Sequence, residues 1–213
     1  MSVNGLTPAV CRAPGGRGLN EQPVQIVFVL GVGVEEWLAA AGRVEVPRPL
    51  SCPSCGHGEV SFDGWYPRQT RRGRVSIQRR LCGNGGCSQR SHSLLPDVLV
   101  SGRCDLASVI GWALEAKAAG MGHRPIAEVL GVPAATVRGW LRRAAAGGGR
   151  VANRLLAVAA AADPAVRAPP TVGPVATLVG AVYIAAGAFV RLEGEPVDRW
   201  RFAVRHSGGR LLG

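Results

Sequence analysis

The chain has 213 residues, of which 47% are hydrophobic, and it carries a formal net charge of +11 with a pI of about 10.8. This length allows one or two compact domains, and the hydrophobic fraction excludes wholesale disorder. A positive excess of this size favours a polyanionic partner, either nucleic acid or an anionic membrane surface, although basic character can also serve solubility alone. Almost all of the charge is arginine, which suits contacts to phosphate and guanine.

The N-terminal region has no basic segment, apolar core and small-residue cleavage site of the kind that marks a secretion signal. Residues 1–23 are rich in glycine and proline and are predicted to form a disordered lead-in. We therefore expect a cytoplasmic protein, in a reducing compartment where clustered cysteines bind metals more often than they form disulfides. The apolar residues 24–34 predict a strand or a buried turn, and residues 35–41 predict a helix with Trp37 on its apolar side.

Two short-spaced pairs of cysteines form the strongest motif in the chain. Two residues separate Cys52 from Cys55 and four separate Cys82 from Cys87, so each pair can form a tight turn that presents two sulfurs to one ion. Zn²⁺ binds four thiolates tetrahedrally, and such a site leaves no position for water. We predict that these cysteines hold a structural Zn²⁺ and build a zinc ribbon.

Other interpretations of the cysteines remain open. A redox-active pair would need a βαβ setting that the sequence does not provide, and disulfides are disfavoured by the expected compartment. His57 and His92 lie near the motif in sequence, and either could replace a cysteine as ligand. A surface or supporting role is the stronger expectation for both histidines.

The segment between the cysteine pairs is predicted to be a basic β-hairpin. Residues 59–63 and 74–80 alternate in the manner of strands, and residues 67–73 are turn-prone. Beside Trp65 and Tyr66, the arginines could grip phosphates and stack on bases; the alternative is a solvated face with two core aromatics. Seven arginines and no acidic residue lie in the interval 64–96, and those predicted to contact DNA are Arg71, Arg72 and Arg74.

Beyond Pro96 the spacing of apolar residues changes from a period of two to a period of 3.6, which is typical of helices. Four helices are predicted: 105–119 with Asp105 as its cap, 125–131 with Pro125 in its first turn, 134–145 ended by the glycines 147–149, and 151–162.

Residues 123–143 have the pattern of a helix-turn-helix. Ala127, Gly131 and Val137 fall at offsets of zero, four and ten, where a small residue lets two helices approach, a glycine turns the chain and an apolar residue fills the space between them. The second helix would then face the major groove of double-stranded DNA. Its predicted DNA contacts are Ala134, Ala135, Thr136, Arg138, Arg142 and Arg143. The alternative is a plain helical hairpin.

Residues 172–190 contain no charged residue and come close to the minimum length of a membrane span. Several glycines, Pro174 and many alanines favour a buried helix instead, so a membrane-associated regulator is the weaker hypothesis. The basic tail 198–213 carries no motif.

A zinc ribbon, then the segment from His92 to Pro96, then a helix-turn-helix is an order that resembles the N-terminal DNA-recognition part of insertion-element transposases. It is especially similar to a family of GC-rich bacteria, domain of unknown function 6431. The resemblance covers about residues 24–143 and implies that the four cysteines are ligands and that residues 134–143 form the recognition helix. The four-residue spacing of Cys82 and Cys87 departs from the usual two.

We therefore expect an α+β protein, with a small zinc-ribbon β-hairpin domain at 24–96, an all-α helix-turn-helix DNA-binding domain at 103–163, and an apolar helix with a basic tail at 164–213. The expected function is double-stranded DNA binding without catalysis or a small-molecule substrate, as a transcriptional regulator or a mobile-element accessory factor. After Arg143 the sequence is too short for a strand-transfer domain. A truncated transposase subunit that acts with a catalytic partner is the alternative, and the oligomeric state, a homodimer included, is left open.

Overall fold

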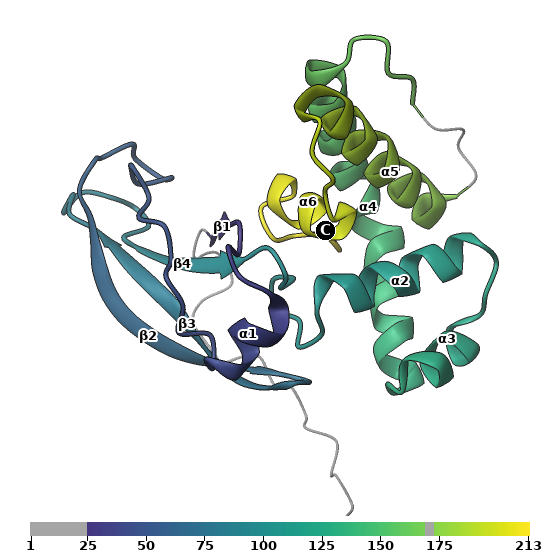
Figure 1. Ribbon diagram of the computed structural model, residues 1–213, viewed down its shortest axis with the longest axis horizontal. Helices are drawn as coiled ribbons and strands as arrows, with labels where there is room; N and C mark the ends of the chain where they lie inside the picture. Colours follow the sequence, from purple (N-terminus) through teal and green to yellow (C-terminus); the bar gives the residue numbers. More distant parts are fainter. Residues whose placement is uncertain (1–24, 169–172) are drawn as a thin grey trace, which may run out of the picture.

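The structure is a computed structural model that describes residues 25–168 and 173–213. Within these residues the N-terminal part forms a four-stranded sheet and the C-terminal part is helical, so the predicted α+β class is confirmed (Figure 1). The predicted disordered lead-in over residues 1–23 lies outside the described residues, as do Val24 and Val172 at the starts of two predicted segments.

The sheet has the order β1-β4-β3-β2, with β1 parallel to β4 and the other neighbours antiparallel. A short helix, α1 (Val34–Ala39), follows β1 and buries Trp37 against the sheet, as its apolar position predicts. Strand β4 was not predicted, because its residues are mostly buried and lack a period-two alternation. The strands are β1 (Gln25–Phe28), β2 (Val60–Thr70), β3 (Gly73–Cys82) and β4 (Ser91–Pro96).

The hairpin of β2 and β3 is longer than predicted. The predicted turn at 67–73 is wrong, because strand pairing continues to Thr70 opposite Gly73 and only two residues turn the chain. Pro67 pairs with Ser76 inside β2, and a proline is tolerated there because β2 is an edge strand. A bulge between Phe62 and Trp65 contains Gly64 at a φ of +89°, which explains why alternation fails at this point.

The helices share one hydrophobic core, to which Leu211 and Leu212 from the chain's last residues also contribute. The region 198–213, which carried no sequence motif, thus forms a helix capped by Asp198, whose side chain accepts from the backbone N–H groups of Trp200 and Arg201. The helices are α2 (Ala107–Ala118), α3 (His123–Leu130), α4 (Ala134–Ala162), α5 (Pro174–Glu193) and α6 (Arg199–His206).

The prediction that glycines 147–149 end a helix is wrong, since α4 runs through them without a break. Gly147 and Gly148 are buried, and their lack of a side chain permits close packing. A Cβ on Gly147 would lie 2.6 Å from the Cα of Gly213, and one on Gly148 would lie 3.2 Å from a methyl group of Leu178 on α5. The helix tolerates the low propensity of glycine because α5 and the chain's last residues pack directly on its backbone.

The predicted cap of the first helix is also wrong. Leu106 occupies the N-cap position of α2 and makes no side-chain capping bond. Asp105 forms a two-pronged ion pair with Arg71 instead, and the backbone N–H of Arg71 donates to the carbonyl of Cys104 at 2.9 Å. The tip of the hairpin is thereby fastened to the segment that leads into α2.

A buried carboxylate joins the sheet to the last helix. Asp97, just after β4, is 1% exposed and accepts hydrogen bonds from the Nε of Arg201 at 3.0 Å and from the N–H of Leu30 at 3.3 Å. Arg205 adds a charge at 3.7 Å, and Arg201 also donates to the carbonyl of Leu30. Helix α6 therefore lies between the sheet and the other helices (Figure 1).

Helix α5 is the one helix in the described residues that is long and apolar enough to cross a membrane, judged by length and composition alone. It lies beside α4 and contributes Leu178, Ala181 and Val182 to the shared core. A core helix passes the same length test, so this feature is weak evidence for a membrane span.

Close packing of α6 on α2 yields a stability prediction. A Cβ on Gly111 would overlap the indole ring of the buried Trp200, whereas one on Gly149, in the same kind of helical environment, would meet nothing within 4 Å. We expect Gly111→Ala to lower the free energy of unfolding by about 1–3 kcal/mol through overpacking. Gly149→Ala should raise it by about 0.5–1 kcal/mol through helix propensity. Denaturant titration measures both, and equal effects would contradict this account of the α2–α6 contact.

Candidate metal centre and nucleic-acid interface

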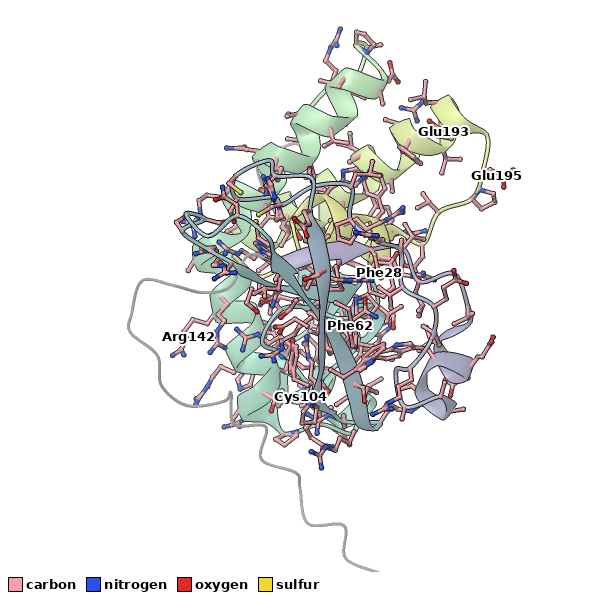
Figure 2. All side chains as sticks on the ribbon, turned by 90° about the vertical axis from the view of Figure 1, so that its left-hand side faces the viewer. Phe28, Phe62, Cys104, Arg142, Glu193 and Glu195 are labelled. Atoms are coloured by element: carbon pink, nitrogen blue, oxygen red, sulfur yellow. The ribbon has the colours of Figure 1, made fainter. Side chains whose placement is uncertain are left out.

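Four cysteine sulfurs converge at the end of the sheet opposite the hairpin tip. The sulfurs of Cys52, Cys55, Cys82 and Cys87 all lie within 4.8 Å of one another. The first two precede β2, the third ends β3, and the fourth lies in the β3–β4 connection. Figure 2 shows sulfur atoms gathered where these loops meet. The structure therefore brings together the complete set of cysteines that the spacing predicted as ligands.

Local hydrogen bonds explain why two differently spaced pairs can meet. The first turn closes when the N–H of Gly56 donates to the carbonyl of Cys52 at 2.8 Å, with Gly56 at a φ of +73°. The wider second turn is filled by Asn84, whose side-chain oxygen accepts from the N–H of Gly86 at 2.9 Å and whose carbonyl accepts from that of Cys87 at 3.1 Å. Asn84 thus compensates for the unusual four-residue spacing.

The sulfur separations fit a tetrahedral ion. Cys52 and Cys87 are 3.8 Å apart at their Sγ atoms, and Cys55 and Cys82 are 3.6 Å apart. A disulfide would place two sulfurs about 2.05 Å apart, so these are not disulfides. Four ligands at about 2.3 Å around a tetrahedral ion would stand roughly 3.8 Å from each other. The cluster can therefore hold a metal ion.

The electrostatics of the cluster also favour a cation. Burial raises the pKa of Cys82 to about 12 and raises the pKa of Cys87 as well. Burial acts in the same direction on Cys52, but hydrogen bonds to its sulfur, among them one from the N–H of Ser54, bring its pKa to about 6. Four thiolates cannot coexist in this space unless a positive ion neutralises them.

The two nearby histidines have different positions. His92 is fully buried on β4, and its Nε2 lies 3.2 Å from the Sγ of Cys52. His57 is exposed and faces Glu59 at 3.8 Å. His92 therefore contacts the sulfur of a candidate ligand, whereas His57 lies on the surface.

The segment of the predicted helix-turn-helix forms two helices joined by a tight turn. Gly131 adopts a φ of +63° at the end of α3, and the N–H of Val132 donates to the carbonyl of Ala127 at 3.1 Å. Ala127 and Val137, the small and apolar positions of the pattern, are both buried. The other buried side chains of this segment are Ile126, Trp140 and Leu141.

The first half of α4 presents its predicted contact residues to solvent. Arg138, Arg142 and Arg143 are exposed, and Figure 2 shows Arg142 projecting from the molecule. Ala135 is exposed, and Ala134 and Thr136 are partly exposed. These residues share one face because they lie opposite the buried positions of the helix.

The arginines at the hairpin tip are engaged within the chain. Arg71 pairs with Asp105 and Arg72 pairs with Glu35 at 2.7 Å, while Arg74 is exposed. Arg68 donates to the carbonyls of Val100 and Arg103. The prediction that Arg71, Arg72 and Arg74 bind DNA stays a prediction, and the first two have a structural role.

One arginine near α4 was missed by the sequence analysis. Burial lowers the pKa of Arg103, and the positive charge of Arg143 lowers it further, which places the two guanidinium groups close enough to repel each other. Arg103 lies in an irregular connection without periodicity, so no local pattern could have assigned it to the face of α4.

The metal centre yields a prediction about composition and stability. We expect the purified chain to carry about one metal ion, because a closed four-sulfur site binds its ion tightly. Cys82→Ser should lose the ion and destabilise the sheet, because Val60 is, within the described part of the chain, the one other hydrophobic side chain buried in the cysteine cluster. Elemental analysis and thermal unfolding measure both effects. Ser88→Ala, at an exposed neighbour of Cys87, should change neither. A metal-free wild-type protein of equal stability would refute the site.

The unequal histidines yield a second prediction. His92→Phe removes the hydrogen bond to Cys52 while filling the buried space, and it should weaken metal affinity about 10- to 100-fold. His57→Phe should leave the affinity unchanged, because His57 contacts Glu59 rather than a sulfur. Competition with a chromogenic chelator measures the affinity, and matching values for the two variants would exclude a supporting role for His92.

The chain matches no protein-family model, no curated protein and no solved structure. The resemblance to the DNA-recognition part of transposases is thus neither supported nor contradicted by these comparisons, and the assignment of function depends on the geometry described above.

Proposed function

We propose that this chain is a cytoplasmic, non-catalytic protein that binds double-stranded DNA through the first half of α4 and holds Zn²⁺ in its four-cysteine site. It would act as a transcriptional regulator or as an accessory factor of a mobile element. The observation that carries this proposal is the composition of α4, which has five arginines and no acidic residue along 29 positions.

The exposed positive charges of α4 are suited to binding a polyanion. Its arginines are all exposed, and their long side chains can reach phosphates on either side of a groove. The nearby Arg103 adds a further positive charge from the connection before α2. An exposed helix of one sign attracts DNA at long range and loses that attraction as salt rises. The arginines of α4 are Arg138, Arg142, Arg143, Arg150 and Arg154.

The start of α4 is suited to close approach. Ala134 and Ala135 are small, and the first turn of a helix carries partial positive charge from its free N–H groups. In a helix-turn-helix, a glycine turn between two helices lets the second helix enter the major groove, and α4 would take that role here. Arg138, one turn further on, is then the side chain best placed to reach a base edge.

Zinc is the ion that a closed set of four thiolates favours. With no coordination position left for water, the ion would be structural, and its binding free energy would stabilise the loops of the sheet. Those loops lie at the far end of the hairpin whose tip is fastened to the start of α2 by Arg71 and Asp105. The ion would thus stabilise the hairpin, whose tip contacts the segment that leads into α2.

The proposal predicts a specific DNA-binding defect. Arg138→Ala should weaken binding to a selected duplex by about 1–3 kcal/mol and relax sequence preference, if the side chain reads a base. Arg210→Ala removes the same charge from an exposed position near the C-terminal end and should have little effect. Fluorescence anisotropy on a duplex selected from a random pool measures both, and the affinity should fall steeply with salt.

The outcomes separate the alternatives. An equal loss on every sequence would make Arg138 a phosphate contact rather than a base contact. If the wild-type chain selects no sequence and its weak binding does not depend on α4, the proposal fails.

A further inference from the structure

We propose that the hairpin carries a second nucleic-acid site, in which Phe62 stacks on an unpaired base and Arg80 contacts the adjoining phosphate. The site lies on β2 and β3 near the metal centre and uses none of the residues of α4. It goes beyond the proposed duplex binding, because stacking on a base face requires a base that is not covered by its neighbours in a duplex.

Phe62 is the aromatic side chain of the hairpin that faces solvent. It is 54% exposed, whereas Trp65 and Tyr66 are half-buried and Tyr66 packs on the core of the sheet. The ring of Trp65 meets Phe62 edge to face, with centroids 6.2 Å apart, and this contact restrains the orientation of the Phe62 ring. A ring held in one orientation on an exposed strand offers a π face on which an unpaired base can stack.

Arg80 supplies the charge beside that ring. It is the direct cross-strand partner of Phe62, and its guanidinium carbon lies 6.0 Å from the ring centroid. Within the described residues Arg80 has no acidic partner, and its buried Nε has no hydrogen-bond acceptor. An anionic oxygen would satisfy this donor.

The surroundings of Arg80 are positive as well. Arg48 is close enough for its charge to lower the pKa of Arg80, which burial already lowers. The one acidic side chain of β2, Asp63, is paired with Arg79 at 3.6 Å, and Glu59, just before β2, faces His57. Arg80 beside the exposed ring of Phe62, with a second positive charge acting on it from Arg48, matches a nucleotide, which combines a negative phosphate with a planar ring.

The bulge explains why this arrangement exists at the protein surface. Register shifts between Phe62 and Trp65, so the side chains on either side of Gly64 do not follow a simple alternation. Phe62 and Trp65 are three positions apart. In a regular strand, where successive side chains alternate between faces, they would lie on opposite faces of β2. The bulge allows the two rings to meet while Phe62 stays exposed.

The test uses Phe62→Leu, which retains apolar volume but lacks a π face. We expect its affinity for a short oligothymidine to fall about tenfold, because stacking of one base contributes that much. Binding of an abasic strand of equal length should not change, since the phosphates still meet Arg80. Phe62→Trp should keep the affinity for both probes, and Arg80→Ala should weaken both. Fluorescence anisotropy measures the affinities, with metal content and thermal unfolding as checks on folding.

Each outcome decides the proposal. It is overturned if Phe62→Leu binds oligothymidine as tightly as the wild-type chain, or if the abasic strand loses affinity to the same degree. Binding of an acidic peptide with the same dependence on Phe62 would replace the nucleotide with a protein partner and also overturn it. Because the probes are single strands, Arg138→Ala should bind them normally, so failure of duplex binding and failure of this site are distinguishable.

Discussion

The placement of the helices against the sheet depends on the buried carboxylate of Asp97. An ionised carboxylate that is 1% exposed costs several kcal/mol unless charges and hydrogen bonds offset the loss of water. Arg201 and Arg205 of α6 supply the charges, and Arg201 also binds the carbonyl of Leu30. Since α6 also packs through Trp200 into the space left by Gly111 of α2, the carboxylate of Asp97 couples the segments that follow β1 and β4 to α6. Loss of either arginine would leave that charge partly unpaired inside the protein.

A second polar contact acts at the hairpin tip. Arg71 and Asp105 fasten the tip to the start of α2, and Arg68 binds the carbonyls of the connecting segment. The hairpin is therefore held at one end by these arginines and closed at the other by the cysteines. This division changes the interpretation of the basic hairpin. The arginines near the tip serve the fold, whereas Arg80 and Arg48 near the metal centre remain available to an anion.

Local sequence patterns predicted the features that close within a few residues, but not those that depend on contacts between distant parts of the chain. The spacing of Cys52, Cys55, Cys82 and Cys87 identified the cluster because each pair closes through bonds within a few residues. Apolar periodicity likewise located α2 and α3. The errors concern residues whose roles are set by distant parts of the chain. Gly147 and Gly148 were predicted to end a helix. The residues that pack on them, Gly213 and Leu178, lie far away in sequence, so no local pattern indicated a role in packing. Asp105 was predicted to cap a helix, because its ion-pair partner Arg71 precedes it by more than thirty positions and could not be identified from local sequence.

The buried hydrophobic residues that the structure describes form three separate clusters, so the candidate metal site and the helices need not depend on each other for stability. Helices α2 to α6 share one hydrophobic cluster, the sheet and α1 share another, and Val60 with the buried Cys52, Cys82 and Cys87 forms the third. A cluster of one valine and three cysteines buries too little apolar surface to hold its loops in place. A metal ion bound by the cysteines would therefore supply most of their stability, while the helical cluster has its own apolar core. Metal loss would then disorder the end of the hairpin that bears Phe62 and Arg80 before it disturbs α4, so the two surfaces proposed to meet nucleic acid differ in their dependence on the metal.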